Sequence, residues 1–303
     1  MMVGAGRSVP TGGIVDRHGL GSEPTRRDNF HLMAQTLSRG PVTGTATGKR
    51  KRRPFLIDLY STAVGKKYVM AITGIIGILF VIGHMVGNLK VYLGVIVEGD
   101  ESAYDIDIYG EFLRDLLVPL LPRTFFLWGF RLVLIGALLL HLHAAYSLTI
   151  LNRKARPVKY QTARDYQVAN FASRTMRWTG IIVVLFLIWH LADLTWGFAN
   201  PDFVRGAVYR NLDASLSRLP VAIFYVLANI ALGIHLFHGT WSLFQSLGWN
   251  NPRFNQWRQG LAAGVATVIV VGNCSIPIAV QAGIIDFDPD AITCCVDETE
   301  AGS

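Results

Sequence analysis

The chain has 303 residues, of which 51% are hydrophobic and 16% are charged, and its mean hydropathy of +0.36 lies far above that of soluble proteins. This composition excludes a largely disordered chain and disfavours a single water-soluble core. A net charge of +7 suits either nucleic acid or an anionic membrane surface. The basic and acidic residues alternate, however, between loops that separate long apolar runs, which indicates a membrane protein with no nucleic-acid partner.

Residues 1–54 are expected to form a flexible, basic extension. They are rich in Gly, Ser, Thr and Arg, contain no apolar run long enough for a signal peptide or a membrane span, and offer Met33 as an alternative first residue. A basic cluster at residues 49–53 leads into the segment PFLIDLYSTAVGKKY, where apolar and polar residues mix at helical spacing. This pattern predicts a short helix along the cytoplasmic surface of the membrane.

Five apolar stretches follow, each long enough as a helix to cross a hydrocarbon layer about 30 Å thick. Inside lipid every backbone polar group needs an internal partner, so these stretches are expected to be helices. The predicted fold is an all-α integral membrane bundle of five transmembrane helices within residues 55–285, followed by an acidic tail at residues 286–303. The spans cover approximately residues 68–93, 125–151, 178–198, 219–247 and 261–285.

The charges around the spans predict their orientation, because basic loops stay on the cytoplasmic side. The segment before the first span and the second connection are basic, whereas the first connection is acidic and the tail has no Lys or Arg. We therefore expect a multi-pass protein of the cell (inner) membrane, with its N-terminus cytoplasmic and its C-terminus outside. The basic cytoplasmic surface includes Lys66, Lys67, Arg153, Lys154 and Arg156.

Six of the eight histidines lie within the apolar spans. Ionisable side chains are costly in hydrocarbon and are usually functional there. One such histidine could simply bond to a neighbouring helix, but six on four helices indicate ligand sites. They are His84, His141, His143, His190, His235 and His238.

The depths of these histidines predict two pairs. At 1.5 Å per residue, His84 lies about 24 Å and His190 about 18 Å from the inner ends of their spans, which places both in the outer half. His143 and His235 lie about 22 Å and about 21 Å from the outer ends of theirs, in the inner half. Two neutral imidazoles that face each other across an iron bind a b-type haem, so an outer and an inner haem are expected. Glycines that would give room for haem, or serve close helix packing, are Gly74, Gly77, Gly83, Gly87, Gly129 and Gly136.

Two histidines are then surplus. His141 is two positions from His143, about 200° around a helix, so both cannot serve one ligand site. His238 shares a face with His235, one turn nearer the cytoplasm. It would partner a haem propionate or a quinone carbonyl, or else only pack.

Four segments read GIIGILFVIGHMVGNL, HAAYSLTILNRKARPVKY, FLIWHLADLTWG and HLFHGTWSLFQSLGWNNP. In this order they resemble four helices of the single-chain, five-helix cytochrome b membrane anchor of succinate dehydrogenases and fumarate reductases. The resemblance covers about residues 55–285, and its most specific part is HxxHGxWSxFQSLG. It implies that the chain docks an iron–sulfur subunit and a flavoprotein subunit and passes electrons between succinate and quinone. In the two-haem branch of the family, the axial ligands match His84 with His190 and His143 with His235.

The sequence is also compatible with cofactors other than two b-type haems. Some branches of the family keep one haem or none, and a Rieske-type iron–sulfur cluster takes two Cys and two His. Such a cluster would use Cys274 of the fifth span with the surplus histidines. Against it, the sequence has no Rieske-type CxH and CxxH pair, and Cys294 and Cys295 are expected beyond the outer face. Cys274 could equally be a small buried apolar residue.

Quinone reduction needs an apolar slot, donors for two carbonyls and a proton route. A slot near the docked subunit would use Trp178, His238 and Trp241. A slot or proton route on the far side would use Asp193 and Arg131, which could instead pair with each other or with haem propionates.

The succinate site is expected on another chain, because no dinucleotide-binding glycine pattern is present. The basic cytoplasmic surface would dock the iron–sulfur subunit, although ordinary topology produces the same charges. The alternatives are a free-standing transmembrane di-haem cytochrome and a histidine-lined proton channel or transporter. The lipid bilayer is a further partner, and assembly into a higher oligomer stays open.

Overall fold

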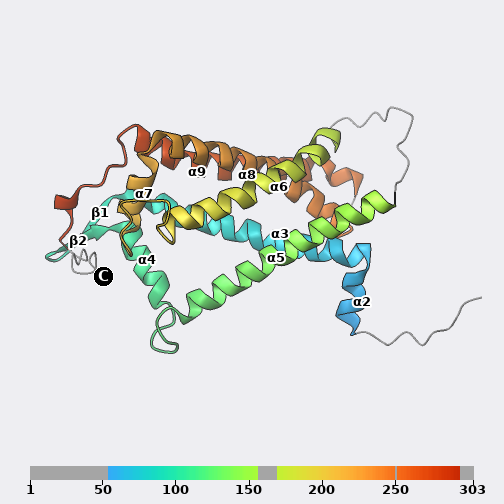
Figure 1. Cartoon of the computed structure of the whole chain (residues 1–303), viewed down its shortest axis with the longest axis horizontal. Helices are drawn as coiled ribbons and strands as arrows, with labels where there is room; N and C mark the ends of the chain where they lie inside the picture. Colours follow the sequence, from blue (N-terminus) through green and yellow to red (C-terminus); the bar gives the residue numbers. More distant parts are fainter. Residues whose placement is uncertain (1–53, 156–168, 250, 294–303) are drawn as a thin grey trace, which may run out of the picture. The chain divides into compact units, whose positions relative to one another are not determined.

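The computed structural model describes residues 54–155, 169–249 and 251–293, so the expected N-terminal extension lies outside the described residues except for residue 54. Five long helices dominate the described part (Figure 1). They are α3 (Ala63–Asn88), α5 (Phe125–Lys154), α6 (Ala169–Leu194), α8 (Leu219–Ser246) and α9 (Asn255–Gln281). Each contains a stretch long and apolar enough to cross a membrane, which confirms the prediction of a multi-pass bundle with five transmembrane helices.

The helix ends differ from the predicted spans by a few residues. α6 ends at Leu194 rather than near residue 198, because the chain turns at Gly197, whose φ of 79° favours glycine. α9 begins at Asn255 rather than near residue 261 and continues through Pro277. Apolar runs therefore locate membrane helices well, whereas turn residues decide where each helix stops.

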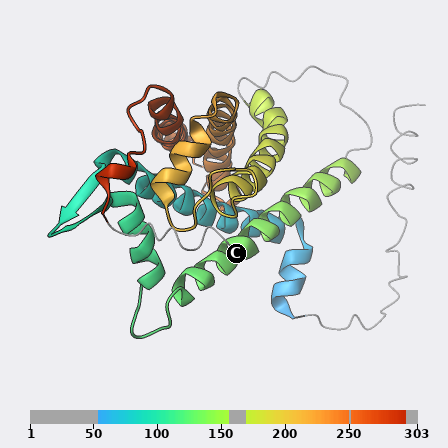
Figure 2. The same ribbon diagram turned by 60° about the vertical axis from the view of Figure 1, so that its left-hand side comes forward.

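The helix α3 occupies a central position among the long helices. It packs on α5 and also touches α8 and α9, while α8 packs on both α9 and α6. In both views α3 lies between α5 on one side and the α8–α9 pair on the other (Figures 1 and 2). Side chains of α3 can therefore meet partners from both sides.

Small residues let α8 and α9 approach closely. Ala231 of α8 and Ala262 and Ala266 of α9 are buried. A side chain added at Gly233 of α8 would collide with Val270 of α9. Close packing through small residues is the usual way in which helices associate in lipid.

A layer of short elements lies beside the ends of the long helices, and the sequence did not predict it. The strands β1 (Val95–Glu98) and β2 (Glu101–Tyr104) pair antiparallel. The helices α4 (Asp105–Asp115) and α7 (Val208–Leu216) follow the first and third long helices, and two 3₁₀ turns complete the layer, η1 (Leu89–Leu93) and η3 (Pro289–Ala291). Together with parts of α8 and α9 these elements form an apolar core. We call these six elements the cap layer.

Aromatic and polar contacts hold the cap layer together. The rings of Tyr104 and Tyr209 stack with centroids 3.7 Å apart. Lys90 and Asp105 form an ion pair at 2.6 Å, and the backbone N–H of Thr293 bonds to the Ser102 hydroxyl at 2.9 Å. The start of the expected tail, up to residue 293, is thus packed against the hairpin.

The helix α2 (Phe55–Ser61) precedes α3. Thr62 separates the two helices and caps α3, because its hydroxyl accepts the Gly65 N–H at 2.9 Å. Phe55 and Ile57 of α2 are exposed. A short 3₁₀ turn, η2 (Pro252–Phe254), connects α8 to α9.

Candidate functional site

Two histidines from α3 and α6 face each other. The ring centroids of His84 and His190 lie 5.8 Å apart with an angle of 88° between the ring planes. Phe80 stacks on His84, and Phe186 lies against His190. The structure therefore brings together the two histidines that the sequence placed in the outer half.

A second pair comes from α5 and α8, and it differs from the expected one. The rings of His141 and His235 lie 6.4 Å apart at an angle of 67°. His143, the expected partner of His235, is exposed and bonds through Nδ1 to the hydroxyl of Tyr60 on α2.

The structure places His141, rather than the expected His143, beside His235 for a geometric reason. Residues two apart on a helix point about 200° apart, so only one of His141 and His143 can face the interior. Their depths differ by only about 3 Å, so depth could not choose between them. The choice depends on the rotation of α5, which packing against α3 decides.

Each inner histidine contacts a buried threonine on the neighbouring helix. Thr73 Oγ1 lies 3.1 Å from His141 Nδ1, and Thr179 Oγ1 lies 3.4 Å from His235 Nδ1. Each hydroxyl donates its only hydrogen to a carbonyl of its own helix, Thr73 to Val69 at 2.7 Å and Thr179 to Thr175 at 3.1 Å. Towards histidine both hydroxyls can only accept, so the ring hydrogen is on Nδ1.

This arrangement leaves Nε2 of His141 and His235 with a lone pair, the state that a metal ligand requires. No comparable hydroxyl selects the same state for His143, because the Tyr60 hydroxyl has no second acceptor among the described contacts. The hydroxyl contacts of His141 and His143 therefore differ in whether they select one state of the ring.

The dimensions of both pairs fit an iron between two imidazoles. Metal–imidazole bonds of about 2 Å and ring radii of about 1 Å give roughly 6 Å between the centroids of two such ligands. The observed separations are 5.8 and 6.4 Å. The two sites are stacked along α3, since Thr73 of the inner site and His84 of the outer site are about 16 Å apart along the helix.

Small residues surround the paired rings. A Cβ at Gly180 would lie 3.4 Å from the His235 ring, and one at Gly74 would lie 3.7 Å from the His141 ring. At Gly77 and Gly136, a Cβ would have no atom of another side chain within 4 Å, which means open space beside α3 and α5. A macrocycle between helices needs open space of this kind.

Asp193, expected to bind quinone or to pair with Arg131, has other partners. Its side chain is 0% exposed and accepts hydrogen bonds from Arg218, Tyr225 and Ser215. Arg131 is exposed and lies over the Trp128 ring, with Cζ 5.1 Å from its centroid. The structure therefore does not bring Asp193 and Arg131 together.

The other quinone candidates separate into two groups. His238 is 8% exposed; its Nε2 lies 3.4 Å from the Thr175 hydroxyl, and its Nδ1 has no hydrogen-bond partner among the described residues. Trp241, one turn later on α8, has a buried indole N–H that also lacks a hydrogen-bond partner among the described residues. Trp178 is 71% exposed and does not contribute to a buried slot.

Cys274 has no described contact with a paired histidine. Its Sγ is 3.8 Å from the Val226 carbonyl oxygen, and its side chain is buried. Within the described ranges no group of three or more His, Cys, Asp or Glu could hold a metal ion. Cys294 and Cys295 lie outside the described residues.

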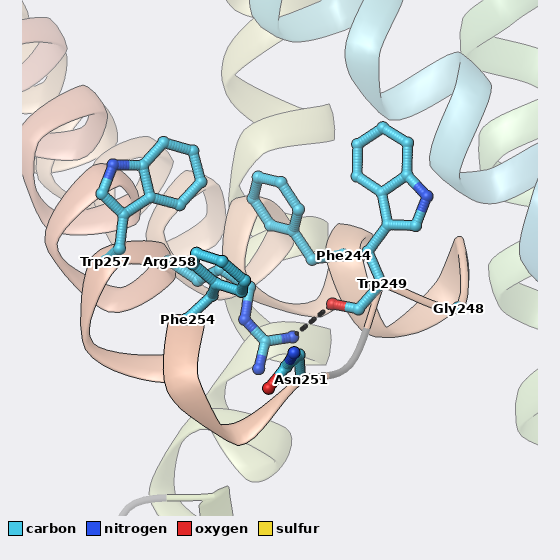
Figure 3. A pocket seen from close by; sticks show the side chains of 7 residues that line it. All are labelled: Phe244, Gly248, Trp249, Asn251, Phe254, Trp257 and Arg258. Atoms are coloured by element: carbon cyan, nitrogen blue, oxygen red, sulfur yellow. Dashed lines mark hydrogen bonds between the residues drawn. The ribbon is translucent and has the colours of Figure 1, made fainter.

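A pocket of about 490 Å³ lies where α8 turns into α9, and the sequence did not indicate it (Figure 3). Arg258, only 1% exposed, lines it and donates to the Trp249 carbonyl at 2.9 Å. Figure 3 shows the aromatic rings around this guanidinium. The other lining residues are Phe244, Gly248, Asn251, Phe254 and Trp257. The buried arginine thus holds the turn that follows the HxxHGxWSxFQSLG motif.

A comparison with protein-family models matches residues 151–273 to the succinate dehydrogenase/fumarate reductase transmembrane subunit. Residues 151–273 are therefore similar to that family. The match confirms the resemblance inferred from the sequence, and it contains His190 and His235. Comparisons with curated proteins and with solved structures find no match. The transmembrane subunits of this family are parts of an oxidoreductase complex.

Proposed function

We propose that this chain is the membrane anchor and electron-transfer subunit of a succinate:quinone oxidoreductase. The observation that carries the proposal is the presence of two histidine pairs, stacked along α3, in a helical bundle of which residues 151–273 match the family. In this proposal His84 with His190 and His141 with His235 each hold one b-type haem. When bound, haem supplies an iron that carries one electron at a time.

The protein's own groups prepare these sites. Thr73 and Thr179 hold the inner imidazoles with the ring hydrogen on Nδ1, so that Nε2 is available for the iron. Gly74 and Gly180 allow the helices to approach these rings. Phe80 packs against His84 and Phe186 against His190 in the outer pair.

Quinone would bind beside the inner site. His238 Nδ1 and the Trp241 indole N–H are buried polar atoms without hydrogen-bond partners in the described part of the chain. Buried polar groups normally have partners, so such atoms mark places where a ligand supplies them. Quinone carbonyls or haem propionates are suitable acceptors.

The remaining partners follow from the charge distribution. Lys66, Lys67, Arg153 and Lys154 flank α3 and α5 at the ends expected to be cytoplasmic. These residues would meet the iron–sulfur subunit, which carries electrons from the flavoprotein subunit that oxidises succinate. In this orientation the N-terminus is cytoplasmic and the cap layer lies outside.

Isolation of the complex through an affinity tag on this chain tests the proposal. We expect flavin and iron–sulfur protein to co-purify with it and succinate to reduce an added quinone. Isolation of the chain alone with haem would instead indicate a free-standing cytochrome. Trp241→Phe should raise KM for quinone without changing succinate oxidation by a soluble dye, whereas the control Trp257→Phe should change neither.

A further inference from the structure

Asp193 joins α6 to the two elements that follow it. Its Oδ1 accepts from Nη2 of Arg218 at 2.7 Å. Its Oδ2 accepts from the Tyr225 hydroxyl at 2.8 Å and from the Ser215 hydroxyl. Arg218 also donates to the Ala199 carbonyl at 2.8 Å. The carboxylate is therefore fully surrounded by donors.

Tyr225 connects this carboxylate to the outer histidine pair. Its hydroxyl oxygen lies 3.5 Å from Nδ1 of His190, and its side chain is buried. A phenol has one hydrogen to donate, and Tyr225 directs it to Asp193. Towards His190 the hydroxyl can only accept, so the Nδ1 hydrogen of His190 points to Tyr225.

We propose that Tyr225, backed by Asp193, is a positioning residue that fixes the His190 ring and makes it a stronger electron donor to iron. This inference rests on the proposed function, because it concerns the outer haem. A carboxylate behind the hydroxyl increases its strength as an acceptor, which makes the imidazole more basic at Nε2. A more basic ligand stabilises oxidised iron and lowers the reduction potential of the centre.

The inner pair lacks this arrangement. The hydroxyls of Thr73 and Thr179 donate to neutral backbone carbonyls, so no charge stands behind them. Deleting the Tyr225 hydroxyl should therefore act on the outer centre alone.

A purely structural role for the network is separable from this role. Ser215 and Tyr225 each donate one hydroxyl hydrogen to Oδ2 of Asp193, but only Tyr225 reaches His190. Ser215→Ala and Tyr225→Phe therefore remove equivalent bonds from the carboxylate and differ in their connection to the ring. Ser215→Ala is the matched control.

The experiment is a potentiometric titration of the haem α-band in the purified complex, with electron paramagnetic resonance of the oxidised haems as a second readout. In Tyr225→Phe we expect one component to shift to higher potential and its resonance to change, while Ser215→Ala resembles the wild type. Asp193→Asn keeps the shape of the acceptor and should shift the same component in the same direction. It replaces Tyr225→Phe as the test if that variant does not assemble.

Equal shifts in Tyr225→Phe and Ser215→Ala, or no shift in Tyr225→Phe and Asp193→Asn, would overturn the inference and leave the proposed function intact. A wild-type complex without any haem band would overturn the haem assignment itself. That spectrum is recorded before any variant, so the two failures are distinguishable.

Discussion

At the scale of single residues, hydroxyl groups are placed to decide which nitrogen of a paired histidine carries its hydrogen. Thr73, Thr179 and Tyr225 each donate their only hydrogen elsewhere and accept from a histidine Nδ1. A ring held in this way presents Nε2 without further rearrangement. Residue type and spacing show where histidines are, but the state of each ring depends on such contacts.

Replacing either threonine by valine tests this role. Thr73→Val or Thr179→Val keeps the side-chain volume and removes the acceptor for the Nδ1 hydrogen. Loss of an outer hydrogen-bond partner of a metal-binding histidine typically weakens metal binding about 10–100-fold. In a titration with an apoprotein that binds haem tightly, we expect each variant to lose the inner haem at a correspondingly lower apoprotein concentration than the unmodified chain.

Thr149→Val is the matched control, because Thr149 on α5 also donates to a backbone carbonyl, that of Ala145 at 2.8 Å. Its hydroxyl makes no described contact with a histidine. Equal haem loss in Thr149→Val and Thr73→Val would show that general helix stability, rather than the state of the ring, explains the effect.

The difference between His141 and His143 shows what the sequence could and could not predict at this scale. Their position within an apolar span and the depth of the inner pair follow from residue positions. The identity of the inward ring depends on the rotation of α5, and the weakly amphipathic apolar sequence of this helix does not encode it. Tyr60 on α2, which holds His143, carries no sequence signal for that contact.

At the scale of elements, the long helices were predictable and the cap layer was not. Continuous apolar runs identify spans without any knowledge of their neighbours. The hairpin and α7 are short and polar on one side, and their contacts join residues far apart in sequence, such as Tyr104 with Tyr209. From the sequence, part of this layer is visible only as an acidic connection after the first span.

The cap layer should become more stable as pH falls. Burial raises the pKa of the Asp107 carboxyl above its ordinary value of 3.8, and the hydrogen bond from the Tyr209 N–H opposes this only in part. Burial also raises the pKa of Asp213. The folded layer then holds protons that the unfolded chain has released, so this contribution is present at low pH and is lost as pH rises through the folded pKa values.

Hydrogen exchange of α4 and α7, corrected for the intrinsic effect of pH, measures this change. We expect higher protection near about pH 4 than near pH 7. In the double variant Asp107→Asn and Asp213→Asn the difference should shrink. Protection that increases with pH in the unmodified chain would contradict the expected sign.

At the scale of the whole molecule, the bundle places two similar histidine pairs one after the other along α3. His84 and Thr73 lie on the same helix, and their partners come from α5, α6 and α8. The family match covers the segment that provides His190 and His235, while the other two paired histidines, His84 and His141, precede it. The two sites therefore depend on the assembly of four helices. The sequence alone predicts that histidine pairs exist, but the members of each pair depend on how these helices are arranged.

The most direct test is a reduced-minus-oxidised optical spectrum of the purified complex with quantified haem, repeated for His84→Ala, His141→Ala and His143→Ala. We predict two haem components per chain in the unmodified protein, loss of one in His84→Ala, loss of the other in His141→Ala, and retention of both in His143→Ala. A spectrum without haem, or loss of a component in His143→Ala but not in His141→Ala, would contradict this account.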